Sequence, residues 1–173
     1  RICAAASHTR PTTLLDTLET SLKSLANISS MVPLSDFSNI DITSSPGKIK
    51  LHQTNFINSI VNSHTTKLSK QPSRPPPTPA DETATTGLYN IVTSTLACPP
   101  TSTNSLDDTD AAIYRSLVHS LSRCATGTRP DVAYATGMLL KCIDKPTKAL
   151  LDAPYRVLCY LQHEITLGIT YSL

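Results

Sequence analysis

The 173 residues suffice for about one domain with a buried core, but only 5% of them are aromatic and none is Trp. With 13 prolines and 39% hydrophobic residues, the composition favours a globular chain that carries a loose, Ser/Thr/Pro-rich portion. A net charge of +2 identifies no partner, and no apolar run approaches the roughly 20 residues of a membrane-spanning helix. No glycine-rich phosphate loop, serine-nucleophile elbow or zinc-protease helix occurs.

The cysteines indicate an intracellular protein with reduced thiols. Their number is odd and no two form a Cys-x-x-Cys pair, so the sequence predicts neither a disulfide framework nor a zinc site. Free cysteines behave as small hydrophobic residues, and we expect most of them to be buried. They are Cys3, Cys98, Cys124, Cys142 and Cys159. The chain also begins with Arg1 inside a short apolar run, so we expect it to be a fragment.

The first third of the chain predicts a helix, a hairpin and a second helix. Residues 12–27 have leucines at helical spacing, which predicts an amphipathic surface helix that packs on a sheet. Residues 37–43 and 48–51 alternate apolar and polar side chains around the turn-forming residues 44–47, which predicts a β-hairpin. Residues 53–63 follow as a short amphipathic helix.

Residues 42–80 contain no Asp or Glu, and their charge pattern suits a polyanion. The basic residues of this stretch are Lys48, Lys50, Lys67, Lys70 and Arg74. Charge alone leaves a solvated basic loop equally open. No interleaved aromatic platform is present to stack bases, so a sequence-independent contact to the phosphate backbone is the most that the pattern supports.

The middle of the chain predicts little regular structure. Prolines crowd residues 71–79 and favour an extended connector, residues 88–97 are an apolar run of uncertain type, and residues 98–109 form a second linker. Asp107 and Asp108 are either a carboxylate pair for two-metal chemistry or the acidic entry of a helix. Their Ser, Thr and Asn surroundings favour the helix entry, where the helix dipole stabilises negative charge.

Three amphipathic helices and a short strand are predicted for residues 110–173. The apolar positions of the helices are Ile113, Leu117, Leu121 and Cys124, then Val132, Thr136, Leu139, Leu140 and Ile143, then Leu150, Val157, Leu158, Leu161 and Ile165. We expect Pro154 to restart or kink the last helix. Arg129 and Asp131 belong either to a functional site or to a turn in which Pro130 opens the next helix, and the turn is favoured. The predicted fold is α+β and mostly helical, with a small β-hairpin and a Pro/Thr-rich disordered middle.

Several motifs in this C-terminal part follow one another in a specific order. They are Tyr114-Arg115-Ser116-Leu117-Val118, Thr128-Arg129-Pro130-Asp131, Lys145-Pro146-Thr147-Lys148, Arg156-Val157-Leu158 and Leu167-Gly168-Ile169. In this order they resemble the reverse transcriptases of copia-type LTR retrotransposons. The resemblance implies that residues 1–70 form the end of the palm, a primer-grip-like hairpin and the start of the thumb. Residues 71–109 would be a linker with a short ordered piece near 88–97, and residues 110–173 a three-helix connection unit before RNase H.

The resemblance also implies that the chain positions the template-primer of an RNA-directed DNA polymerase. The family's catalytic Tyr-x-Asp-Asp motif does not occur in it. We therefore expect no catalytic residue, no metal site and no cofactor in this chain, with Mg²⁺ held elsewhere in the complete polymerase, and no activity of the chain alone. The expected nucleic-acid contacts are Asn39, Lys48, Lys50, Lys67, Lys70, Arg74 and Arg129. Asn39 stands where the family has Gly, and Asn is the next most tolerant residue of positive φ.

The implied partners are an RNA/DNA template-primer and the upstream polymerase and downstream RNase H segments of a polyprotein, without a membrane. The implied location is a cytoplasmic virus-like particle or the nucleus. A second hypothesis is a degenerate, non-catalytic relic or a helical interaction module. Departures from the family pattern favour it, because Ser38-Asn39 replaces Leu-Gly, His119 replaces Gly and Pro154 replaces Ala. We expect His119 to point outward or to loosen a helix contact.

Overall fold

The computed structural model describes residues 12–25, 35–65, 76–80, 87–97 and 104–172, and it divides into two compact units, Arg1–Ser38 and Asn39–Leu173. The first unit holds α1 (Thr12–Leu25) and β1 (Asp36–Phe37). The leucine spacing thus predicted a helix correctly. Leu18 and Leu25 of α1 are exposed. The expected packing of this helix on a sheet stays a prediction.

The second unit contains an antiparallel sheet in which β3 (Lys48–His52) pairs with both β2 (Ile40–Ser45) and β4 (Gly168–Ser172). Gly47 joins β2 to β3 with a φ of 72°, which glycine adopts without steric cost, and the predicted hairpin is confirmed. The strand predicted for residues 37–43 is interrupted. Ser38 and Asn39 between β1 and β2 have φ values of 52° and 67°, and this left-handed backbone cannot continue a strand.

The register sorts the side chains of this sheet into a polar and an apolar face. Residues directly opposite each other in an antiparallel sheet share a face, and successive residues alternate between faces. We call one side the polar sheet face; its residues are Asp41, Thr43, Ser45, Lys48, Lys50, His52, Thr170 and Ser172. The other face carries Ile42, Ile49, Leu51, Ile169 and Tyr171. The alternation of polar and apolar residues along each strand therefore decides which face of the sheet is available to a polar partner.

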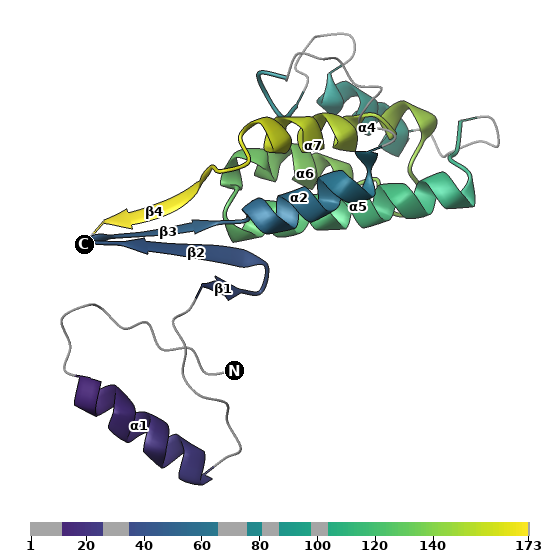
Figure 1. Ribbon diagram of the computed structural model, residues 1–173. Coiled ribbons are helices and arrows are strands. Elements are labelled where there is room, and N and C mark those ends of the chain that lie inside the picture. Colours follow the sequence, from purple (N-terminus) through teal and green to yellow (C-terminus); the bar gives the residue numbers. More distant parts are fainter. Residues whose placement is uncertain (1–11, 26–34, 66–75, 81–86, 98–103, 173) are drawn as a thin grey trace. The chain divides into compact units, whose positions relative to one another are not determined.

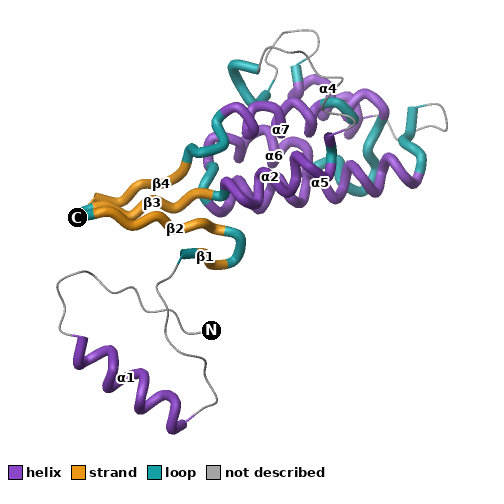
Figure 2. Tube along the Cα trace, in the orientation of Figure 1, coloured by secondary structure: helices purple, strands orange, loops and turns teal. Residues whose placement is uncertain are grey.

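The rest of the second unit is helical and contains the hydrophobic core. The helices are α2 (Thr54–Ser63), α4 (Leu88–Ala97), α5 (Asp108–Gly127), α6 (Ala133–Leu140) and α7 (Ala153–His163), with short 3-10 turns at Pro130–Val132 and Lys148–Leu150. Figures 1 and 2 show α2, α5, α6 and α7 side by side, with β3 running directly into α2. Fully buried Leu117, Leu139 and Leu158 come from three of these helices. Each buried side chain of this size contributes about 1.5–3 kcal/mol.

The predicted helical pattern of the C-terminal part is confirmed. The apolar residues of α5 and α7 are buried together, and the Tyr114 hydroxyl donates to the Leu139 carbonyl at 3.0 Å, which ties α5 to α6. The apolar run at residues 88–97 is a helix as well. Pro154 is the second residue of α7, so a helix starts there, as one of the two expectations had it. The N–H that proline lacks has no partner within the helix at this position, so its loss costs no hydrogen bond.

Three of the cysteines lie in the described residues and are free. Cys124 and Cys142 are buried, and Cys159 is half-buried. Burial raises the pKa of the Cys124 thiol to about 12, against a smaller lowering effect of the Arg129 charge. The expectation of reduced, mostly buried thiols fits these three, whereas Cys3 and Cys98 lie outside the described residues.

The fold is α+β and mostly helical, as the sequence predicted. β4 pairs with β3 and joins both ends of residues 39–173 in one compact unit, and the division at residue 110 that the resemblance implies stays a prediction. The Pro-rich stretch expected to be disordered lies largely outside the described residues. Among the described helices, none is both long and apolar enough to cross a membrane.

Candidate nucleic-acid interface

Two lysines lie between pairs of hydroxyl groups on the polar sheet face. Lys48 is opposite Ser45 of β2 and Ser172 of β4. Lys50 is opposite Thr43 and Thr170 in the same way. The two rows are two residues apart along β3, or about 7 Å. Ammonium and hydroxyl groups are typical phosphate contacts that carry no sequence information.

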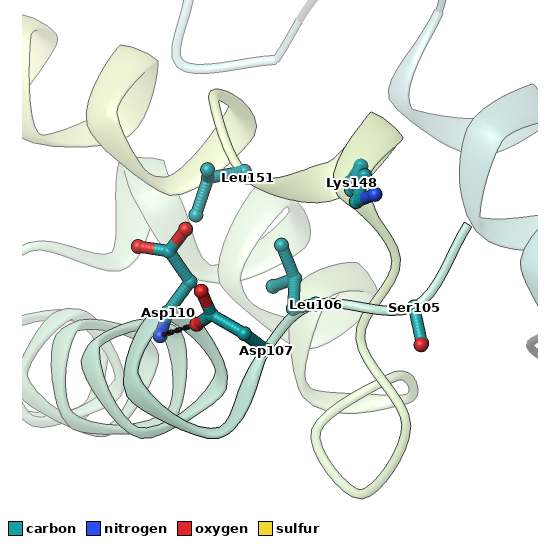
Figure 3. A pocket seen from close by; sticks show the side chains of 6 residues that line it. All are labelled: Ser105, Leu106, Asp107, Asp110, Lys148 and Leu151. Atoms are coloured by element: carbon teal, nitrogen blue, oxygen red, sulfur yellow. Dashed lines mark hydrogen bonds between the residues drawn. The ribbon is translucent and has the colours of Figure 1, made fainter. Parts of the chain in front are cut away.

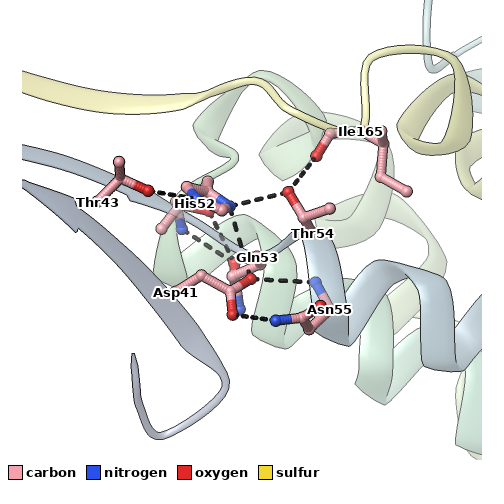
Figure 4. Close-up of polar contacts among 8 residues, drawn as sticks. Asp41, Thr43, His52, Gln53, Thr54, Asn55 and Ile165 are labelled. Atoms are coloured by element: carbon pink, nitrogen blue, oxygen red, sulfur yellow. Dashed lines mark hydrogen bonds and ion pairs between the residues drawn. The ribbon is translucent and has the colours of Figure 1, made fainter. Parts of the chain in front are cut away.

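A polar cluster joins this sheet to the N-terminus of α2 (Figure 4). Asp41 of β2 accepts hydrogen bonds from the Asn55 backbone N–H at 3.0 Å and from its side-chain amide at 2.6 Å. Gln53, which precedes the helix, gives it no side-chain cap, so Asp41 supplies the missing acceptor. The carboxylate also lies favourably near the positive end of the helix dipole.

His52 completes this cluster through both ring nitrogens. The Thr54 hydroxyl donates to the Ile165 carbonyl at 3.2 Å, so it accepts from His52 Nδ1 at 2.8 Å. His52 Nε2 lies 3.1 Å from the Thr43 hydroxyl, and Nδ1 lies 3.5 Å from Asp41 Oδ2. The bonds connect β2, β3, α2 and the segment after α7. They tie the polar sheet face to the helices.

Gln53 makes the corresponding connection from α2 to the end of α5. Its side chain is buried, and its Oε1 accepts from the Thr128 N–H at 3.2 Å and from the Thr128 hydroxyl at 3.0 Å. A Cβ at residue 127 would lie 2.6 Å from this oxygen, so Gly127 leaves the space that Gln53 occupies. Neither residue was predicted from the sequence as a contact between α2 and α5. For Gln53, the only sign in the sequence was its position as a polar residue between a predicted strand and a predicted amphipathic helix.

Asn39 is exposed, and its positive φ is the conformation that a glycine at this position would favour. It does not lie beside the lysines. Six residues of extended chain separate it from Ser45, the neighbour of Lys48, so the two ends of this surface are about 20 Å apart. Lys67, Lys70 and Arg74, also expected to contact nucleic acid, lie outside the described residues.

Arg129 does not fit the expected contact with nucleic acid, because its side chain is fully buried. Its Nε and Nη2 donate to the Asp131 carboxylate at 3.0 and 2.7 Å, and its Nη1 donates to the Glu164 carbonyl at 2.7 Å. Its guanidinium also lies 5.7 Å from the centre of the Tyr160 ring. The favoured interpretation of this motif as a turn agrees with the structure. Arg129 ties the turn after α5 to the end of α7.

The same ion pair predicts a loss of stability in acid. Burial alone would raise the pKa of Asp131, but the hydrogen bonds and charge of Arg129 outweigh it and lower this pKa from the ordinary 3.8. Its stabilising contribution is therefore complete above pH 3.8 and is lost as the pH falls through the lowered value. Urea unfolding should show a gap in stability between the wild type and Asp131→Asn that is constant above pH 3.8 and shrinks as the pH falls from 3.8 to the lowered value. A gap independent of pH would contradict this assignment.

The acidic residues at the start of α5 serve the helix. Asp107 is the residue before the helix, and its carboxylate accepts from the Asp110 N–H at 2.7 Å, which confirms the expected helix entry. Asp107 and Asp110 line an open pocket of about 450 Å³ together with Lys148 (Figure 3). No three His, Cys, Asp or Glu side chains in the described part of the chain are grouped to hold a metal ion.

His119 is exposed, so it points outward as one of the two expectations had it.

Comparison with known proteins gives one informative match. Over 157 residues, or 91% of this chain, the sequence is 28% identical to an uncharacterized mitochondrial protein of Arabidopsis thaliana. The chain spans 57% of the length of that relative. No protein-family model matches the chain, and no solved structure matches it.

Proposed function

We propose that this chain is the C-terminal part of a copia-type RNA-directed DNA polymerase and that it positions the template-primer. The observation that carries the proposal is the polar sheet face, where Lys48 and Lys50 each lie between two hydroxyl groups. The positive φ of Asn39 supports a primer-grip-like turn, since the family's glycine would take the same backbone conformation there. The order of the C-terminal motifs supports the choice of family.

In this proposal the chain binds nucleic acid through the phosphate backbone and does not read bases. Lysine ammonium groups neutralise phosphates, and the release of condensed counterions drives the binding. The hydroxyls of Ser45 and Ser172 beside Lys48, and of Thr170 beside Lys50, would donate to the same phosphates and fix their position. Asn39, about 20 Å from Lys48, would contact the other end of a bound duplex.

Nucleotidyl transfer would take place outside this chain. The family's two Mg²⁺ ions supply the chemistry by stabilising the attacking and leaving oxygens. The carboxylates described here do not fit that role, because Asp107 caps α5, Asp41 caps α2 and Asp131 pairs with Arg129. The upstream polymerase segment, the downstream RNase H segment and an intracellular location remain parts of the proposal.

The salt dependence of binding to a primed RNA/DNA duplex tests this proposal. We compare the wild type with Lys48→Ala/Lys50→Ala and with a control, Lys141→Ala/Lys145→Ala, which removes two exposed lysines outside the sheet. Each phosphate contact contributes about 0.9 to the slope of log affinity against log salt. We therefore expect the slope of the sheet variant to be shallower by up to about two units, and that of the control to match the wild type.

Two results would contradict the proposed function. One is a folded wild type that binds no duplex at low salt, which would favour the relic or interaction-module hypothesis. The other is equal slopes for the sheet variant and the control. Circular dichroism of each variant shows whether the protein is folded.

A further inference from the structure

Three basic side chains form a line along the exposed side of α5. Arg115, His119 and Arg123 are spaced four residues apart, so they lie on one face of the helix, and all three are exposed. We call them the α5 stripe. Eight residues of helix place its two ends about 12 Å apart. The helix has no acidic residue after Asp110, so the stripe is not neutralised from within α5.

The two arginines of the stripe are held in place and still have free donors. Arg115 Nε donates to the Ile143 carbonyl at 3.2 Å, and its Nη2 donates to the Asp144 carbonyl at 3.3 Å. The Arg123 guanidinium lies 5.8 Å from the centre of the Phe56 ring of α2. A guanidinium carries five N–H donors, so these contacts orient each side chain without using all of its donors. Such pre-orientation lowers the entropy cost of binding a phosphate.

The α5 stripe continues from the end of the polar sheet face. β3 runs directly into α2, and the start of α2 is bonded through Gln53 to Thr128 at the end of α5. Arg123 is therefore close to the junction of sheet and helices, and Arg115 is two helical turns further away. Asp41 of the polar sheet face bonds to Asn55 of α2, and the next residue, Phe56, lies under the Arg123 guanidinium, so these contacts lead from the sheet to the α5 stripe.

We propose that the α5 stripe is a second phosphate-binding surface, which extends the lysine contacts of the sheet along one strand of a bound duplex. This inference rests on the proposed function. The inference goes beyond that function because it assigns nucleic-acid contacts to α5, a helix for which the sequence predicted none. The occupant is a nucleic-acid backbone, because arginine forks match phosphate oxygens in geometry and charge.

The test introduces a negative charge at the centre of the stripe. His119 is exposed, so His119→Glu leaves the packing of α5 intact. The matched control is Gln162→Glu, which adds the same charge at an exposed position of α7. With the primed RNA/DNA duplex, we expect His119→Glu to weaken binding roughly fivefold relative to Gln162→Glu. A second variant, Arg123→Gln, should make the salt slope shallower by about 0.9.

Measuring Lys48→Ala/Lys50→Ala in parallel separates the two proposals. If the lysine variant binds weakly while His119→Glu and Arg123→Gln bind as the control does, the α5 stripe is no contact surface and the proposed function stands. If the wild type does not bind, both proposals are overturned. Thermal unfolding of each variant checks that altered binding does not come from loss of folded protein.

Discussion

Replacing Arg129 by Met should lower the free energy of unfolding by about 3–5 kcal/mol. This is the range observed when one partner of a buried ion pair is removed and the other stays. Arg129 is fully buried, and its loss leaves the Asp131 carboxylate without its bidentate partner and the Glu164 carbonyl without its donor. Met fills much of the space but provides no hydrogen bond. Urea unfolding at pH 7, followed by far-UV circular dichroism, measures the change.

Two control variants separate geometry from charge at this site. Arg129→Lys keeps the charge but cannot form a planar, two-pronged contact, so we expect an intermediate loss of stability. Asp131→Asn keeps one acceptor oxygen but leaves the fully buried Arg129 cation without its counter-charge, so we expect a loss of stability close to that of Arg129→Met. If Arg129→Met unfolds at the same urea concentration as the wild type, Arg129 does not tie the turn after α5 to α7.

Replacing Gly168 by Ala should detach β4 from β3 at its first residue. A Cβ at this position would overlap the backbone carbonyl of Leu51, and backbone atoms cannot move aside as a flexible side chain can. We expect a loss of about 1–3 kcal/mol in unfolding free energy, typical of overpacking. Because β4 supplies Thr170 beside Lys50, duplex binding should weaken as well.

Gly137→Ala is the matched control for this substitution. A Cβ at residue 137 would meet no atom within 4 Å, and the residue lies inside α6. Alanine is the better helix former, so this variant should gain about 0.5–1 kcal/mol. Thermal unfolding of both variants distinguishes the two cases. Equal effects of the two substitutions would show that β4 does not approach Leu51 as closely as described.

Local patterns in the sequence were enough to predict most elements of the fold. The 3.6-residue period marks α5 and α7 because their apolar residues face one core, and alternation with Pro46-Gly47 marks the hairpin. The pairing of β4 with β3 left no local signal. It joins Leu51 to Ile169, and a short strand pattern does not encode its partner.

The candidate site could be predicted only in part, for a related reason. Lys48 and Lys50 were found because charge and alternation are visible in the sequence, but the hydroxyls of Thr170 and Ser172 reach them through long-range pairing. Arg129 was expected to contact nucleic acid, but its side chain is fully buried. Its partner, the Glu164 carbonyl, lies 35 residues away, and only the folded chain brings the two together.

Mapping the bound duplex onto the chain tests the central claim most directly. Backbone amide NMR spectra of the protein, recorded while a primed RNA/DNA duplex is added, report which residues it contacts. The proposal predicts the largest shifts for Thr43, Lys48, Lys50 and Thr170 on the polar sheet face, with smaller shifts along the α5 stripe. Shifts concentrated on α4, with unchanged signals from β2, β3 and β4, would contradict it.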